Sequence, residues 1–165
     1  MVLNEGLEAL GPDYPGSRLG MGAFEGSAVG EVLFPSTLRV LRYASFARCG
    51  NLRHLALPEG LETIGRRCFW GSAVEAVAVP DSVTEVAEDA FRGCAALKSV
   101  AFGERSRLAR IGVGAFGGTA LEEFLAPPAL RVLAQAAFYR CLHLRRVELN
   151  EGLEAFGTDE QEDET

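Results

Sequence analysis

Residues 52–69 read LRHLALPEGLETIGRRCF, and this stretch decides the fold of the chain. Its aliphatic residues Leu55 and Leu57 stand at alternate positions, which is the period-two pattern of a short strand. Pro58 ends that strand, because proline cannot donate a hydrogen bond to a sheet ladder. Two more aliphatic residues follow before a glycine, and the unit closes on Phe69. The pattern predicts a strand, a return to the core and a tight turn that inserts an aromatic ring.

The same pattern recurs along the chain at intervals of 22 to 25 residues. Each unit carries a phenylalanine directly after a small residue, and the set is Phe24, Phe46, Phe69, Phe91, Phe116 and Phe138. A unit this short cannot bury its own apolar side, so neighbouring units must stack on one another. We therefore expect a β-rich solenoid of six to seven coils of 22–25 residues. It should have one parallel sheet, short second strands and single-turn helices.

Two unit types alternate, and a longer period overlies them. One type carries Ser27, Ser72 or Thr119 three residues after its phenylalanine, and the other carries Cys49, Cys94 or Cys141. Residues 3–9 read LNEGLEA, and so do residues 149–155. This repeat suggests one block of a longer array. We expect a single solenoid over residues 1–157, an irregular Gly- and Pro-rich loop at 10–22, and a disordered acidic tail at 158–165.

The consensus of the units is L-x-x-V-x-L-P-x-x-L-x-x-I-G-x-x-A-F-x-x-C, and it resembles the BspA-like, or Treponema pallidum-type, leucine-rich repeats over residues 19–157. The LNEGLE block with the loop that follows it is similar to arrays found in dinoflagellate algae. The chain departs from the pattern at Gly103 and Asn150, where proline is usual, and at Ala126, which fills a core column poorly. The resemblance implies a solenoid that recognises proteins or mediates adhesion, with no catalytic site in the repeat itself.

Composition and charge exclude several classes of protein. The chain has 165 residues, of which 48% are hydrophobic and 24% charged, which is typical of a folded domain. Its net charge is −7, and five acidic residues of the tail leave the body near −2, which argues against a nucleic-acid partner. The sequence shows no signal peptide and no apolar run of the roughly 18 residues that span a bilayer. An intracellular or organellar location is favoured over an extracellular one.

Few residues indicate chemistry. Residues 112–117 match G-x-G-x-x-G, but these glycines fall on repeat columns, so nucleotide binding is disfavoured. The column cysteines lie two coils apart, about 10 Å, which is too far for a disulfide, and we expect buried free thiols. We expect no catalytic residue, no cofactor and no metal site. An enzyme or small-ligand binder stays as the least favoured alternative.

The remaining signal is the outward side of the predicted strands. Apolar residues occupy positions that should meet water, and these are Leu33, Ala56, Ala78, Ala101 and Leu125. His54 lies beside them, and Trp70 and Tyr139 each follow the phenylalanine of their unit. An apolar stripe with a polar rim is typical of a partner site, although small residues could instead serve close strand packing. Trp70 and Tyr139 are either interface anchors or cover for neighbouring coils.

The function we predict is therefore a non-enzymatic interaction or scaffold module. In the favoured version it is an accessory subunit docked on a larger assembly, such as an algal organellar complex, and a membrane complex is compatible with this. The alternative is an adhesion or receptor-type surface module. Self-association end to end is a further expectation, because solenoid ends leave strand edges unpaired.

Overall fold

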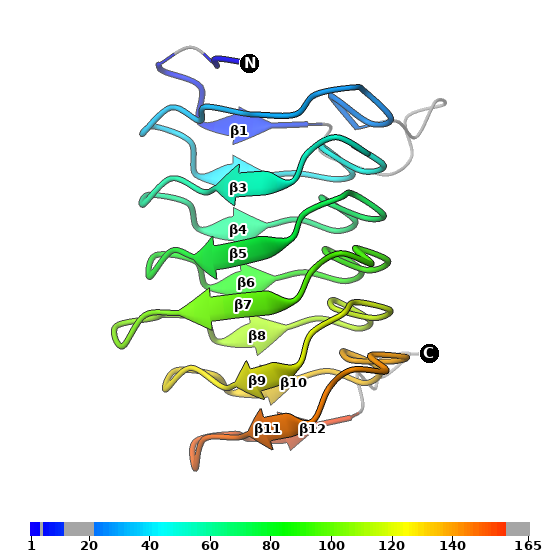
Figure 1. Cartoon of the computed structure of the whole chain (residues 1–165). Coiled ribbons are helices and arrows are strands. Elements are labelled where there is room, and N and C mark those ends of the chain that lie inside the picture. Colours follow the sequence, from blue (N-terminus) through cyan, green and yellow to red (C-terminus); the bar gives the residue numbers. More distant parts are fainter. Residues whose placement is uncertain (4, 12–21, 158–165) are drawn as a thin grey trace, which may run out of the picture.

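The computed structural model describes residues 1–3, 5–11 and 22–157. The chain winds as a stack of flat coils in which the paired strands are parallel and come from equivalent places in neighbouring coils (Figure 1). Of the predicted loop at 10–22, residues 12–21 lie outside the described part, and so does the predicted tail at 158–165. Leu10 belongs to the first strand.

One long sheet, here called the narrow sheet, runs the length of the stack with two residues per strand. Its order is β1-β2-β4-β6-β8-β10-β12. The strands are β1 (Ala9–Leu10), β2 (Val40–Leu41), β4 (Thr63–Ile64), β6 (Glu85–Val86), β8 (Arg110–Ile111), β10 (Val132–Leu133) and β12 (Ala155–Phe156). In each coil the first strand residue is partly exposed, and the second points into the core.

The opposite side of the stack carries longer strands in two separate sheets, here called the broad sheets. They are β3 (His54–Ala56), β5 (Ala76–Val79) and β7 (Ser99–Phe102) in one, and β9 (Glu123–Leu125) with β11 (Arg146–Glu148) in the other. The strands on this side are parallel as predicted, but they form two separate sheets where one was predicted. The break falls where Phe102 meets Phe124 edge to face, with ring centroids 5.9 Å apart, so two bulky rings stand in neighbouring strands.

The predicted single-turn helices are absent from the described residues, and the phenylalanines sit in turns. Phe46, Phe69, Phe91 and Phe116 each donate the backbone N–H to a carbonyl of the next coil at 2.8 Å. Residues two before and two after the phenylalanine adopt positive φ, as at Arg67 (54°) and Gly71 (65°). A helix needs those N–H groups for bonds within its own segment and right-handed φ throughout. The turn therefore stacks in register on its neighbours instead of coiling.

The core lies between the two sides of the stack and is built from columns of identical residues. The phenylalanine rings stack from coil to coil with centroid separations of 5.1 to 5.8 Å and interplanar angles of 3–15°. Each such pair contributes about 0.5–1.5 kcal/mol beyond the apolar area it buries. The four central rings are fully buried, together with the aliphatic columns on both sides. This shared interior fixes the position of both surfaces.

Candidate functional site

The strands of the broad sheets place small apolar residues against water. Their burial alternates, so that Leu55 and Val77 point inward and the residues on either side point outward. The exposed column that the sequence predicted consists of Leu33, Ala56, Ala78, Ala101 and Leu125. Leu33 is 53% exposed and Leu125 is 43% exposed. We call this surface the broad face.

The broad face is hollowed beside Leu33. Ala56 on β3 and Ala78 on β5 lie on the floor, because a methyl group reaches less far from the backbone than a leucine side chain. One shallow depression of about 470 Å³ is lined by Leu33, His54, Ala56, Ala76 and Ala78, with carboxylates at its edge. A second, of about 520 Å³, shares Ala56 and Ala78 and extends toward Pro80. The two depressions form one continuous shallow groove across neighbouring strands.

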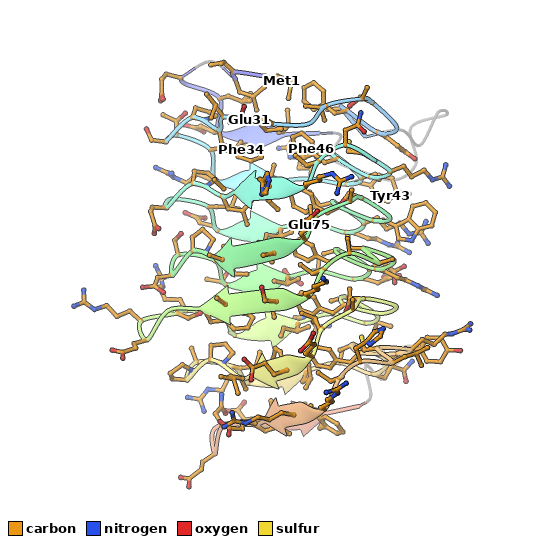
Figure 2. All side chains as sticks on the ribbon, viewed as in Figure 1. Met1, Glu31, Phe34, Tyr43, Phe46 and Glu75 are labelled. Carbon is orange, nitrogen blue, oxygen red and sulfur yellow. The ribbon has the colours of Figure 1, made fainter. Side chains whose placement is uncertain are left out.

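Charged side chains border the groove. Figure 2 is viewed onto this face and labels Glu31 and Glu75, which line one edge. The Arg53 guanidinium lies 2.9 Å from the Glu75 carboxylate and holds it at that edge. His54 is exposed beside the floor. A pair of this exposure adds little to stability, so its main effect is to set the polar character of the rim.

Trp70 and Tyr139 lie apart from the groove. Both belong to the phenylalanine turns, and three coils, about 15 Å along the stack, separate them. Trp70 is only partly exposed, and the Arg48 guanidinium lies 4.5 Å from the centre of its ring. Tyr139 is 57% exposed. The structure therefore does not join these two residues to the broad face or to each other.

The alternating serines and cysteines explain the two unit types. Each cysteine thiol donates to the carbonyl of a phenylalanine in the preceding coil, as Cys94 Sγ does to Phe69 at 3.0 Å. The same sulfur lies 3.4 Å from the Ser72 hydroxyl. The pairs Ser27–Cys49 and Thr119–Cys141 repeat this contact at 3.7 and 3.3 Å. The repeat is thus a two-coil unit with one polar bond in its interior.

The four cysteines are free, and burial favours the protonated thiol at three of them. Burial raises the pKa of Cys94 to about 11, and it also raises the pKa values of Cys68 and Cys49. A thiol held protonated is a poor nucleophile and a poor metal ligand. The described residues also contain no group of three His, Cys, Asp or Glu side chains placed to hold a metal ion. This arrangement suits thiols that stabilise packing.

One feature of the turns was missed by sequence reasoning. Asp89 is buried and has a φ of 56°, and its carboxylate lies 3.5 Å from Arg67 and 3.1 Å from Arg92. Asp tolerates the left-handed region better than most residues. Its place two residues before Phe91 was the available signal, because no other unit has an acidic residue there.

The sequence and the fold both match known leucine-rich repeat proteins. A model of the BspA-type leucine-rich repeat region matches residues 17–145 in six copies. A leucine-rich repeat protein from Bacteroides ovatus is 25% identical, with a TM-score of 0.75, and the match covers 82% of this chain and 35% of the Bacteroides protein. The Treponema pallidum leucine-rich repeat protein is 26% identical with a TM-score of 0.74, covering 83% of this chain and 65% of its own.

A further solved structure shares the fold alone. The pneumococcal vaccine antigen PcpA is 22% identical with a TM-score of 0.57. The match covers 78% of this chain and 32% of PcpA. No curated protein matches the sequence. In the part of the chain that the structure describes, no helix is long and apolar enough to cross a membrane.

Proposed function

The chain belongs to the BspA-type leucine-rich repeat family, and from that premise we propose that it is a non-enzymatic module that binds a protein partner on its broad face. The observation that carries the proposal is the column of exposed alanines between two exposed leucines. Leucine-rich repeat proteins generally serve protein–protein interaction or surface recognition, which agrees with an interaction role.

The shape of the broad face supports a protein partner. The exposed column from Leu33 to Leu125 crosses five neighbouring segments at about 4.8 Å spacing and is roughly 20 Å long, and the groove lies along its part from Leu33 to Ala78. Its floor carries no deep pocket for a small molecule, since both depressions are shallow and their common residues are apolar. A ridge of apolar side chains on a partner would fill the groove and release water from the alanines. The acidic rim around Glu31 and Glu75 favours a partner with basic residues beside that ridge.

The role we assign within this class is an accessory subunit that docks on a larger assembly. The likeness of the LNEGLE block to algal arrays puts an organellar complex first among the assemblies to examine. An adhesion or receptor-type module on a cell surface is the alternative within the same class. The partner decides between them, because a subunit would be captured from an organelle fraction and a surface module would bind an extracellular protein.

The test is affinity capture followed by cross-linking and mass spectrometry. The wild-type chain is compared with Ala78→Glu/Ala101→Glu, which places one charge on the groove floor and one on the next strand of the broad face. Ala95→Glu is the matched control, because Ala95 is an exposed alanine away from the broad face. We expect the same partner from the wild type and the control, with cross-links near the groove, and its loss from the double variant. Equal recovery by all three proteins would contradict the proposal.

A further inference from the structure

The last coil that the structure describes leaves its outward side bare. Val147 and Leu149 are 47% and 46% exposed, and Phe156 is 70% exposed. Phe138 is half-buried, although its counterparts in the central coils are completely buried. Each of these residues belongs to a column that other coils cover on both sides. The outward side of the last described coil is therefore an apolar surface that no described coil covers.

The chain contains the surface on which this end would fit. Residues 149–155 repeat residues 3–9 letter for letter, and Phe156 takes the place of Leu10. Within one chain, residues 1–10 lie against the coil of residues 22–45, and Leu10 is only 9% exposed there. Two copies of one sequence thus occupy opposite ends of the stack, one covered by a following coil and the other uncovered.

The backbone contacts of the first copy define what the second copy lacks. The Glu8 carbonyl accepts the N–H groups of Arg39 and Val40 at 2.7 and 3.1 Å, and the Leu10 carbonyl accepts that of Arg42 at 2.7 Å. The equivalent carbonyls at the far end belong to Glu154 and Phe156. The N–H groups of Glu154 and Ala155 already bond to the preceding coil, at Arg131. Among the described residues no donor reaches the Glu154 and Phe156 carbonyls.

We propose that the occupant of this end is a second copy of the chain, joined by exchange of these equivalent segments. Residues 147–156 of one copy replace residues 1–10 of the next copy, in contact with its coil of residues 22–45. We call this binding position the seat. The seat already accepts this sequence, so the hydrogen bonds gained equal those lost. The inference does not rest on the proposed function, because it concerns the end of the stack and meets the broad face only at Leu33, where Val2 pairs in the single chain.

Simple abutment of the two ends is the competing arrangement, and charge disfavours it. Abutment would set β12 beside β1 of the next copy and place Glu151 and Glu154 next to Glu5 and Glu8. Like charges on directly paired strands are destabilising. Exchange avoids this, because each LNEGLEA segment then faces the coil against which it normally lies.

Exchange also buries surface that both ends leave open. Phe24, at the first turn described, is half-buried, and among the described residues its ring stacks on Phe46 alone, at 5.3 Å. With residues 147–156 in the seat, Phe138 of one copy lies one coil away from Phe24 of the next. The phenylalanine column then runs on from copy to copy. Since the two joined surfaces differ, each added copy presents a new free end, and the assembly is open-ended.

Paired cysteines test the register of the exchange. Val2 pairs with Leu33 in the single chain, so exchange places Glu148 of one copy opposite Leu33 of the next. Leu33→Cys/Glu148→Cys, made with Cys141→Ser, puts the two thiols at opposite ends of one chain, so a disulfide between them must join two copies. We expect a reducible ladder of oligomers on a gel. Val2→Cys/Glu148→Cys is the matched pair for abutment and should give no ladder.

Each other outcome of that experiment overturns the proposal. A ladder from the Val2 pair alone would show abutment, and equal ladders from both pairs would show non-specific contact. The absence of a ladder from the Leu33 pair would show that the end does not take this seat. Variants with only one of the two introduced cysteines measure the background of non-specific disulfides. One introduced thiol per chain can join two copies into a symmetric dimer and cannot build a ladder.

Sedimentation equilibrium tests the competition between the two segments without cysteines. Leu10→Ala weakens the seat of a chain's own residues 1–10 and should strengthen association about tenfold or more. Phe156→Asp places a charge where burial is required and should leave the protein monomeric, both alone and with Leu10→Ala. Thermal melts check that each variant stays folded. A Phe156→Asp protein that associates like the wild type, or a Leu10→Ala protein that associates no better, would contradict the exchange.

Discussion

The two surfaces of the stack differ at matched positions. On the narrow sheet, the central strands β4, β6 and β8 present Thr63, Glu85 and Arg110 to water, and Arg110 lies 3.6 Å from Glu85. On the broad face, the central strands β3, β5 and β7 present alanine at each equivalent place. The interior is common to both surfaces, so the packing of the core does not account for the difference. Among the described residues, the broad face joins exposed alanines to shallow depressions, and that surface is the candidate binding site.

The largest effect should come from the interior, which the two surfaces share. Phe91→Ala removes a fully buried ring that stacks at 5.1 and 5.5 Å on its two neighbours. We expect a loss of about 3–5 kcal/mol in the free energy of unfolding, measured by chemical denaturation. Phe91→Leu keeps much of the volume and should cost about 1.5 kcal/mol or less. Equal losses for the two variants would contradict the role of ring stacking.

A second prediction concerns the protonated thiols of the same interior. Since the folded pKa of Cys94, about 11, exceeds the ordinary value of 9.0, unfolding at high pH releases a proton. The stabilisation is complete below about pH 9 and is lost progressively as the pH rises to about 11, by about 3 kcal/mol. Denaturation of the wild type and Cys94→Ala across this range measures the difference. Parallel decline of both proteins would count against a buried, protonated thiol.

Substitutions in the turns that join the two surfaces should change the free energy of unfolding by smaller amounts and in opposite directions. Gly71 has a φ of 65° with open space around it, and Ala136 has a φ of 56°. Gly71→Ala should lower the free energy of unfolding by about 1 kcal/mol, because a side chain is strained in this region. Ala136→Gly should raise it by about 0.5 kcal/mol, since the strain is relieved and part of the gain is offset by chain entropy. Changes of the same sign in both variants would contradict this description of the turns.

The smallest effects on stability should come from substitutions on the two surfaces. Partner binding, and not stability, should distinguish a substitution on one surface from a substitution on the other. Ala78→Glu on the broad face and Thr63→Glu on the narrow sheet should each change the free energy of unfolding by about 0.5 kcal/mol or less. Only Ala78→Glu should weaken partner binding, by about tenfold or more, because it buries a charge in the groove. Titration of both variants against the captured partner measures this. Weaker binding by Thr63→Glu alone would reverse the comparison.

The sequence predicted the columns of this fold because the residues of each column recur at nearly constant intervals along the chain. Phenylalanines at nearly constant intervals specify a stacked core, and alternation around Leu55 specifies which strand residues meet water. The family and the solenoid follow from these features. The exposed alanines were also identified from spacing, and their role as a binding site is the proposal made above.

The sequence could not supply what depends on contacts between coils. The turns were predicted as single helical turns, yet neighbouring coils take up the Phe46 and Phe69 N–H groups. Glycine two residues after Phe69 was a local sign of positive φ. The sulfur–hydroxyl pairs, such as Ser72 with Cys94, became visible only when the coils were stacked.

Site-specific photo-cross-linking tests the central claim most directly. A benzoylphenylalanine at position 78 lies on the floor of the groove, and one at position 85 lies at a matched place on the narrow sheet. The account predicts that illumination in native extract joins the chain to a discrete protein partner from position 78 and not from position 85. A partner joined from position 85 and not from position 78 would contradict it.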